Sequence, residues 1–518
     1  MSAEAAQLRE ISRLSRRSAF AIALLIAAAI VAILGSLRWV GYQGTDDGQY
    51  VDAALAWYHR VPQIDRSTWT WGLRYPVIFA IDTAFWLFGV NVFAVGAAML
   101  AYLFALVAVS IWMLQRWFGF VESVIFAIIF CGMPGVIVLA TIANDDITEL
   151  FYVAASVACF CAAFDSTYRR YLLVAAGIAA GLAFAVRETT AGLIIAYGLL
   201  FLFRPGIRRS DYFLIGAGFV IVILAEMAYF TIETGNPLWR FMLDFSREPN
   251  LNRAVALAPK HFIDREGNLG IGGPAGTEFF MFFFSQKYAL IFYAMLGVVP
   301  GLARSAWTSS QKTVLIVLGT LFIAWAGFVI GNVKLLDLVP RFIVVTAWVA
   351  AMLAAIGLAR LRRNHLGLVV LSLLALIMSE AVCLYLENTD PSQASFAAID
   401  LALQTHDPVY TNTATKLRGR FVAQIDGVAD KIRIGKPTPG SLYVLAPDDL
   451  KRCDYGGCDA DRAVLSGFNH WKEIERIVPR PRAIGSLLDM IGVTHLIPPE
   501  FRKKIVQPNS GVVIYRVP

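Results

Sequence analysis

The chain has 518 residues, of which 58% are hydrophobic and 16% are charged, and its mean hydropathy is +0.61. Repeated apolar runs are long enough to cross a bilayer core about 30 Å thick, which excludes an ordinary soluble globular protein. The formal charge of +7 does not indicate a nucleic-acid partner, because the basic residues lie in short clusters between the apolar runs. The composition therefore predicts a polytopic α-helical membrane protein embedded in a lipid bilayer.

The apolar runs predict about eleven transmembrane helices. They lie near residues 19–37, 90–114, 121–140, 148–164, 172–186, 189–203, 211–233, 286–303, 313–331, 341–359 and 366–386. The first run could belong to a cleaved signal peptide, but it is long and no small-residue cleavage site follows it. We therefore expect a retained first span.

Clusters of basic residues in the connections predict the orientation. With eleven spans, six of these clusters fall on the same side: Arg9 to Arg17, Arg116, Arg169 to Arg170, Arg204 to Arg209, Arg304 to Lys312, and Arg360 to Arg363. By the positive-inside tendency that side is the cytoplasm. The N-terminus is then cytoplasmic, and the C-terminal region is periplasmic if the protein resides in a bacterial inner membrane.

The composition changes near residue 387, so we expect a transmembrane domain at 1–386 and a soluble α/β domain at 387–518. The segments PVYTN, SLYVLAP, THLIPP and GVVIYRV are typical of short buried strands, and residues 481–491 of a helix. Cys453 and Cys458 flank a Gly-Gly turn there and are candidates for a disulfide in an oxidising compartment.

Two adjacent carboxylates, Asp46 and Asp47, lie in the loop after the first predicted span. Residues 38–89 of this loop contain amphipathic segments that are expected to lie flat in the membrane interface. Like-charge repulsion and partial burial would raise the proton affinity of such a pair, which suits a general base. The alternative is an Asp pair that only caps the helix starting near Gln49. A second pair, Asp145 and Asp146, could likewise cap the next helix or join the first pair.

Basic residues also occur on the outer side, where the positive-inside tendency disfavours them. Arg187 is adjacent to Glu188 between two spans, and Lys334 and Arg341 precede or open the tenth. Charged groups near the apolar core are costly and usually have a partner or a function. A membrane-anchored phosphate would be such a partner. Snorkelling, or ion pairing with Glu188 or Asp337, is the alternative.

Carboxylates and cations on one face suit a transfer reaction at the membrane surface. A carboxylate would deprotonate an acceptor hydroxyl, the oxygen would attack a sugar carbon, and the cations would stabilise the departing lipid phosphate.

Several segments resemble the GT-C glycosyltransferases of the protein O-mannosyltransferase and lipid A aminoarabinose transferase group. DDGQY is similar to the first-loop motif of that group, and GLRYPVIFAIDTAFWLFG to the interfacial helix that follows it. NDDITELF resembles the second acidic loop, TGNPL the start of a long later loop, and VPRFIVVTAWVAAMLA a late span. The resemblance covers about residues 15–386.

The resemblance implies an inverting transferase that uses a polyprenyl-phosphate-linked sugar donor and a lipid, glycan or protein acceptor. It implies Asp46 as the general base. The candidate residues are Asp46 and Asp47 for catalysis, Arg74, Arg187, Lys334 and Arg341 for the donor phosphate, and Tyr50, Asp145, Asp146 and Glu188 for the shape of the site. The lipid A branch often has a basic residue at the position of Gln49 and Lys-Pro-Pro in place of residues 73–76, so the acceptor stays open.

No cofactor is certain from the sequence. The two acidic pairs could hold a divalent metal, although no cluster of histidines supports this. Two other classes of function stay open: a transporter or flippase of polyprenyl-linked sugars, and a non-catalytic scaffold that keeps the fold. The gathering of charges at one face, and the lack of a visible repeat or broken helices at the midplane, favour the enzyme.

Overall fold

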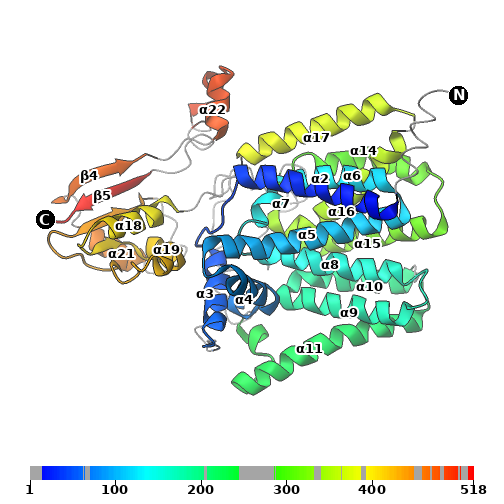
Figure 1. Cartoon of the computed structure of the whole chain (residues 1–518), viewed down its shortest axis with the longest axis horizontal. Coiled ribbons are helices and arrows are strands. Elements are labelled where there is room, and N and C mark those ends of the chain that lie inside the picture. The colour runs from blue at the N-terminus through cyan, green and yellow to red at the C-terminus, as the bar shows by residue number, and fades with distance from the viewer. Residues whose placement is uncertain are drawn as a thin grey trace.

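The computed structural model describes residues 15–61, 64, 70–203, 207–243, 285, 287–331, 340–362, 364–386, 392–447, 458–466, 470–478, 483–499, 502 and 511–518. Long helices lie side by side in a bundle, and a small sheet with its own helices lies beyond one end of it (Figure 1). We call this the domain end of the bundle. The predicted fold class, a polytopic helical membrane protein with a small C-terminal α/β domain, is confirmed.

Each of the eleven predicted spans falls on helices of the bundle. These are α2 (Arg16–Leu37), α5 (Val92–Trp117), α6 (Phe120–Gly132) with α7 (Pro134–Leu139), α8 (Asp145–Ala162), α9 (Arg169–Val186), α10 (Ala191–Phe203), α11 (Tyr212–Thr234), α14 (Ile291–Arg304), α15 (Ser309–Gly331), α16 (Val344–Leu361) and α17 (Leu366–Leu386). Within the described ranges, seven helices are long and apolar enough to cross a membrane. The third predicted span is divided into α6 and α7 because Met133 is extended before Pro134.

Helix α16 forms the centre of the bundle, and 94% of its apolar span is buried. It packs against α6, α14 and α15. Gly357 allows a close approach to α14, because a Cβ atom there would clash with Val298. Trp348 donates a hydrogen bond from Nε1 to the hydroxyl of Ser110 in α5, at 2.9 Å. The turn η5 (Pro340–Ile343) directly precedes α16 and is therefore attached to a tightly packed helix.

Three short elements lie between α2 and α5: α3 (Asp46–Tyr58), η1 (Thr70–Leu73) and α4 (Tyr75–Phe88). Helix α3 runs across the domain end of the bundle rather than along it (Figure 1). Val51, Ile81 and Phe85 belong to a second, smaller core that these elements share with the start of α5. On the other face, Trp86 and Leu87 of α4 are 60% and 71% exposed. A helix with one apolar face exposed in this way is suited to the membrane interface.

The C-terminal domain contains a five-stranded sheet in the order β2-β1-β3-β5-β4. The strands are β1 (Val409–Thr411), β2 (Ile432–Arg433), β3 (Leu442–Leu445), β4 (Lys472–Ile477) and β5 (Val512–Arg516), and the helices are α18 (Gln393–Gln404), α19 (Thr413–Ile425), α21 (Cys458–Leu465) and α22 (Ala483–Met490). β1 is parallel to β2 and β3, whereas β5 is antiparallel to β3 and β4. Val409, Val444 and Ile514 form its core together with α18.

One predicted strand in this domain is wrong. THLIPP forms the 3-10 turn η7 (Thr494–Leu496) instead of a strand. Pro498 and Pro499 follow, and since proline has no backbone N–H, the segment cannot complete a ladder of hydrogen bonds. The candidate disulfide is not tested, because Cys453 and the side chain of Cys458 lie outside the described residues.

Helix α19 packs onto α3 and the loop before it. The ring of Phe421 lies between Tyr42 and Phe85, with centroids 5.4 and 6.0 Å away. Arg420 forms an ion pair with Asp52 of α3 at 3.2 Å. Through these contacts the C-terminal domain packs directly against α3, the helix that begins with Asp46 and Asp47.

Gly44 allows this close approach. Its φ of +70° favours glycine, and a Cβ atom there would clash with the backbone carbonyl of Arg418 in α19. We expect Gly44→Ala to loosen the C-terminal domain, measured as faster release of that domain in limited proteolysis. Gly235→Ala is the control, because Gly235 has a similar φ of +74° and no neighbour within 4 Å of a Cβ atom. Equal proteolysis of the two variants would contradict this role of Gly44.

Candidate active site

Asp46 begins α3 and lies opposite the turn before α16. Its Oδ2 atom accepts a hydrogen bond from Nη2 of Arg341 at 2.9 Å. The side chains of Asp46 and Arg341 are 38% and 28% exposed. Asp46 is therefore both held by a cation and accessible to a second molecule, as a group that exchanges a proton with a substrate must be.

Asp47 has a different environment from its neighbour, because it is 1% exposed and folds back onto its own loop. Its carboxylate accepts hydrogen bonds from the backbone N–H groups of Gln43, Gly44 and Thr45, at 2.6, 3.2 and 2.6 Å. Burial raises the pKa of Asp47, and these hydrogen bonds oppose that shift. Asp47 thus fixes the loop that presents Asp46.

The second acidic pair forms ion pairs with two arginines. Arg74, which lies just before α4, pairs with Asp145 and donates from Nη1 to the hydroxyl of Tyr50 at 3.0 Å. Arg187 pairs through Nη1 with Asp146 at 2.5 Å and through Nε with Asp145 at 3.4 Å. Burial raises the pKa of Tyr50 to about 12, so its hydroxyl stays neutral near pH 7.

Asn144, rather than either aspartate, caps α8. Its side-chain oxygen accepts a hydrogen bond from the backbone N–H of Ile147 at 3.1 Å. The carboxylates of Asp145 and Asp146 are therefore available to the arginines. This favours the interpretation of the pair as part of a site over helix capping alone.

Two further residues that the sequence analysis missed extend the ion pairs. Arg240 contacts Glu188 at 2.5 Å and Glu226 of α11 at 2.8 Å, and Glu188 lies 3.7 Å from Arg74. Arg240 is 1% exposed. The available signals were the arginine in the apolar stretch NPLWRFML and Glu226, the acid farther from the end of the apolar run that forms α11.

Glu149 is a third missed residue. Its Oε1 atom accepts hydrogen bonds from the hydroxyls of Thr189 and Thr190, both at 2.7 Å. These bonds attach the turn η2 (Glu188–Thr190) to α8, next to Arg187. Phe342 of η5 supports the same arginine from another side, since its ring centroid lies 4.2 Å from the guanidinium carbon of Arg187.

We define the ionic network as two groups of charges on either side of Tyr50. One group is the pair Asp46 and Arg341, and the other is the connected set Asp146, Arg187, Asp145, Arg74, Glu188, Arg240 and Glu226. Charges of both groups act on the Tyr50 hydroxyl, and Asp146 also acts on Arg341. The network brings together nearly all of the predicted site residues that the structure describes. Lys334 lies outside the described residues.

The carboxylates of the two loops do not fit a divalent metal. Asp46, Asp145 and Asp146 each pair with a guanidinium group. Within the described ranges, no three His, Cys, Asp or Glu side chains gather closely enough to hold a metal ion.

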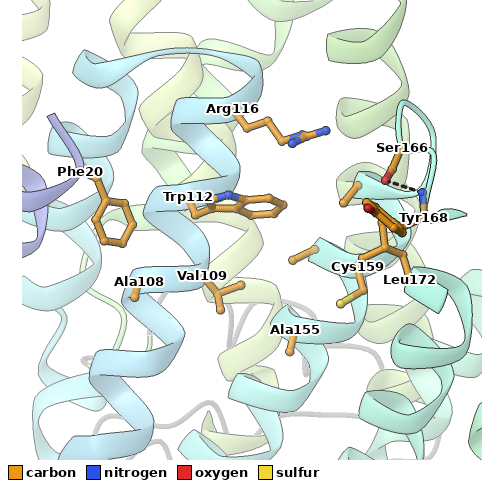
Figure 2. A pocket seen from close by; sticks show the side chains of 12 residues that line it. Phe20, Ala108, Val109, Trp112, Arg116, Ala155, Cys159, Ser166, Tyr168 and Leu172 are labelled. Atoms are coloured by element: carbon orange, nitrogen blue, oxygen red, sulfur yellow. Dashed lines mark hydrogen bonds between the residues drawn. The ribbon is translucent and has the colours of Figure 1, made fainter. Parts of the chain in front are cut away.

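A separate cavity of 610 Å³ lies toward the opposite end of the bundle, between α2, α5, α8 and α9 (Figure 2). Its wall is apolar except near Arg116, Ser166 and Tyr168. No residue of the ionic network lines it.

Solved membrane-protein structures share this arrangement of a helical bundle, short helices across one end and a small C-terminal domain. Among solved structures, ArnT from Cupriavidus metallidurans in the apo state matches with a TM-score of 0.54 and 14% identity, over 89% of this chain and 97% of that one. ArnT bound to undecaprenyl phosphate matches with a TM-score of 0.54 and 13% identity, over 97% and 98%.

The oligosaccharyltransferase from Archaeoglobus fulgidus in the apo form matches with a TM-score of 0.50 and 12% identity, over 89% of this chain and 73% of that one. At these identities the likeness establishes the fold. No protein-family model and no curated protein matches the sequence.

Removing Arg240 should destabilise the protein strongly, because the buried Glu226 would lose its cation and Glu188 would keep only its longer contact to Arg74. We expect Arg240→Met to lower the free energy of unfolding by about 3–5 kcal/mol, as for other buried pairs that lose one partner. Thermal unfolding in detergent measures this. Adding Glu226→Gln should recover part of the loss, and Arg476→Ala, which breaks an exposed pair with Glu473, is the control. A loss no larger than in that control would contradict the structural role of Arg240.

Proposed function

We propose that the protein is an integral-membrane glycosyltransferase that moves a sugar from a polyprenyl-phosphate donor to an acceptor hydroxyl. The observation that carries the proposal is the pairing of the accessible Asp46 with Arg341, next to Tyr50, on whose hydroxyl the buried cations Arg74 and Arg187 also act. The solved structure of ArnT with undecaprenyl phosphate, which has the same fold, supports a polyprenyl phosphate as the donor's carrier.

In the proposed reaction Asp46 takes the proton of the acceptor hydroxyl. The hydroxyl oxygen then forms a bond to the anomeric carbon of the sugar, and the bond between that carbon and the phosphate oxygen breaks. Attack opposite the leaving group inverts the configuration. The lipid phosphate leaves with an additional negative charge, which nearby guanidinium groups stabilise.

Arg341 is the cation best placed for this phosphate, because it is the most exposed arginine of the ionic network. Arg187 and Arg74 would support the phosphate from the buried side, and Lys334 stays a further candidate. A phosphate that approaches Arg341 competes with Asp46 for the guanidinium. Donor binding would therefore release the carboxylate to act as a base.

Asp47 has a positioning role in this proposal. Its carboxylate is occupied by three backbone N–H groups, so it is poorly placed to accept a proton from a substrate. It would act by holding the start of α3, and thereby Asp46, in place.

The proposal places the site at the outer face of a bacterial inner membrane, with the C-terminal domain in the periplasm and the N-terminus in the cytoplasm. This follows from the basic clusters in the opposite connections. Mass spectrometry of lipid and polymer extracts, from cells with and without the gene, would identify the sugar and its acceptor. Redistribution of polyprenyl-linked sugars across the membrane, without loss of a glycoconjugate, would instead indicate a flippase.

Asp46→Asn should abolish transfer, because the amide cannot accept the proton of the acceptor. We expect the rate to fall by roughly 10²- to 10⁴-fold with thermal stability nearly unchanged. Donor binding should be retained or tightened, because the neutral amide competes less than the carboxylate for Arg341. The measurement is sugar transfer by purified protein, or the cellular glycoconjugate in a complemented strain. Asp82→Asn, in α4 and outside the ionic network, is the control. Full activity of Asp46→Asn would exclude Asp46 as the base.

Arg341→Ala should weaken donor binding and slow transfer by roughly 10²-fold, because it removes a charge-assisted contact to the leaving phosphate. Arg341→Lys should keep part of the activity, since the charge remains. Arg116→Ala, at the opposite end of the bundle, is the matched control. If Arg341→Ala left both affinity and rate unchanged, Arg341 would have a snorkelling or structural role.

A further inference from the structure

A carboxyl group lies inside the bundle, apart from the ionic network. Glu380 is in α17, six residues before the helix ends at Leu386, and is 5% exposed. Its Oε1 atom is buried without a hydrogen-bond partner, and no ion pair of Glu380 occurs in the part of the chain that the structure describes. An acid at such a depth is costly unless something pairs with it.

Glu380 lines a crevice of 250 Å³ between α2, α6 and α17. The other lining residues are Ile30, Ile33, Leu34, Ile128, Gly132, Ile377, Ala381 and Leu384. Ile33 and Ile377 are 60% and 41% exposed, so the crevice opens onto the surface that the bundle presents to lipid. Apart from Glu380, it offers only an apolar wall.

Gly132, at the end of α6, makes room for the carboxyl group. A Cβ atom at this position would clash with Oε2 of Glu380. The carboxyl therefore occupies a space that a side chain on α6 would fill, and an added methyl group would displace it.

We infer that this crevice binds a membrane lipid whose head group carries a primary amine. The wall can accommodate an apolar chain. Among the described residues the carboxyl group has no cationic partner, and a primary ammonium group would supply both the charge and N–H donors. Because the crevice opens to lipid, the cation has to arrive attached to an apolar chain. The position of Glu380, about 9 Å along α17 from its end, is within reach of the head-group region.

The test compares two lipids that differ in their head-group donors. Purified protein in non-ionic detergent is titrated with dioleoylphosphatidylethanolamine or with dioleoylphosphatidylcholine, whose quaternary ammonium has no N–H. Retained lipid is measured by native mass spectrometry, and the melting temperature is followed in parallel. We expect about tenfold tighter binding of the ethanolamine lipid, as for a hydrogen bond to a charged group.

Glu380→Gln should remove this preference while leaving the fold intact, since the two side chains have nearly the same shape. Glu122→Gln makes the same change elsewhere on the bundle and should keep the preference. Gly132→Ala keeps the carboxyl but displaces it, and should also lose the preference, which gives a second test if Glu380→Gln does not fold. Equal binding of both lipids to the wild type, or a preference that persists in Glu380→Gln or Gly132→Ala, would overturn the inference.

Discussion

The site depends on the pairing of guanidinium groups with carboxylates at the edge of an apolar bundle. Arg74, Arg187 and Arg240 are almost fully buried, where an unpaired charge would be very costly. Each has at least one carboxylate within 4 Å. These pairs connect the residue before α4, the start of α8, the α9–α10 turn, α11 and the segment after it, and Arg74 also donates a hydrogen bond to Tyr50 of α3. The geometry of the site and the packing of the bundle therefore depend on the same contacts.

The two adjacent acids of the first loop illustrate how neighbours in sequence acquire different roles. Successive side chains on a helix point about 100° apart. At the start of α3 this difference directs Asp47 into the loop, where backbone N–H groups surround it, and leaves Asp46 accessible beside Arg341. Like-charge repulsion between the two, which the sequence suggested, is less important than these separate partners.

The sequence was sufficient for features that depend on local composition. The apolar runs predict the helices of the bundle, and the acids and arginines at their ends predict most of the ionic network. Arg240, Glu226 and Glu149 could not be predicted as members, because their partners are distant in sequence and are determined by helix packing. THLIPP failed for a local reason, since its two prolines outweigh its apolar pattern. Asn144 shows that the residue before an acidic pair can be the one that caps a helix.

The pairing of Asp46 with Arg341 joins positions 295 residues apart in the chain. A ribosome synthesises one partner long before the other. Helix α16, which directly follows Arg341, also fills the centre of the bundle. Until this late segment is inserted, the earlier helices lack both their central packing partner and the cation opposite Asp46. Filling of the bundle's centre and completion of the Asp46–Arg341 pair are therefore the same event in biosynthesis, and a chain interrupted before residue 340 would have neither.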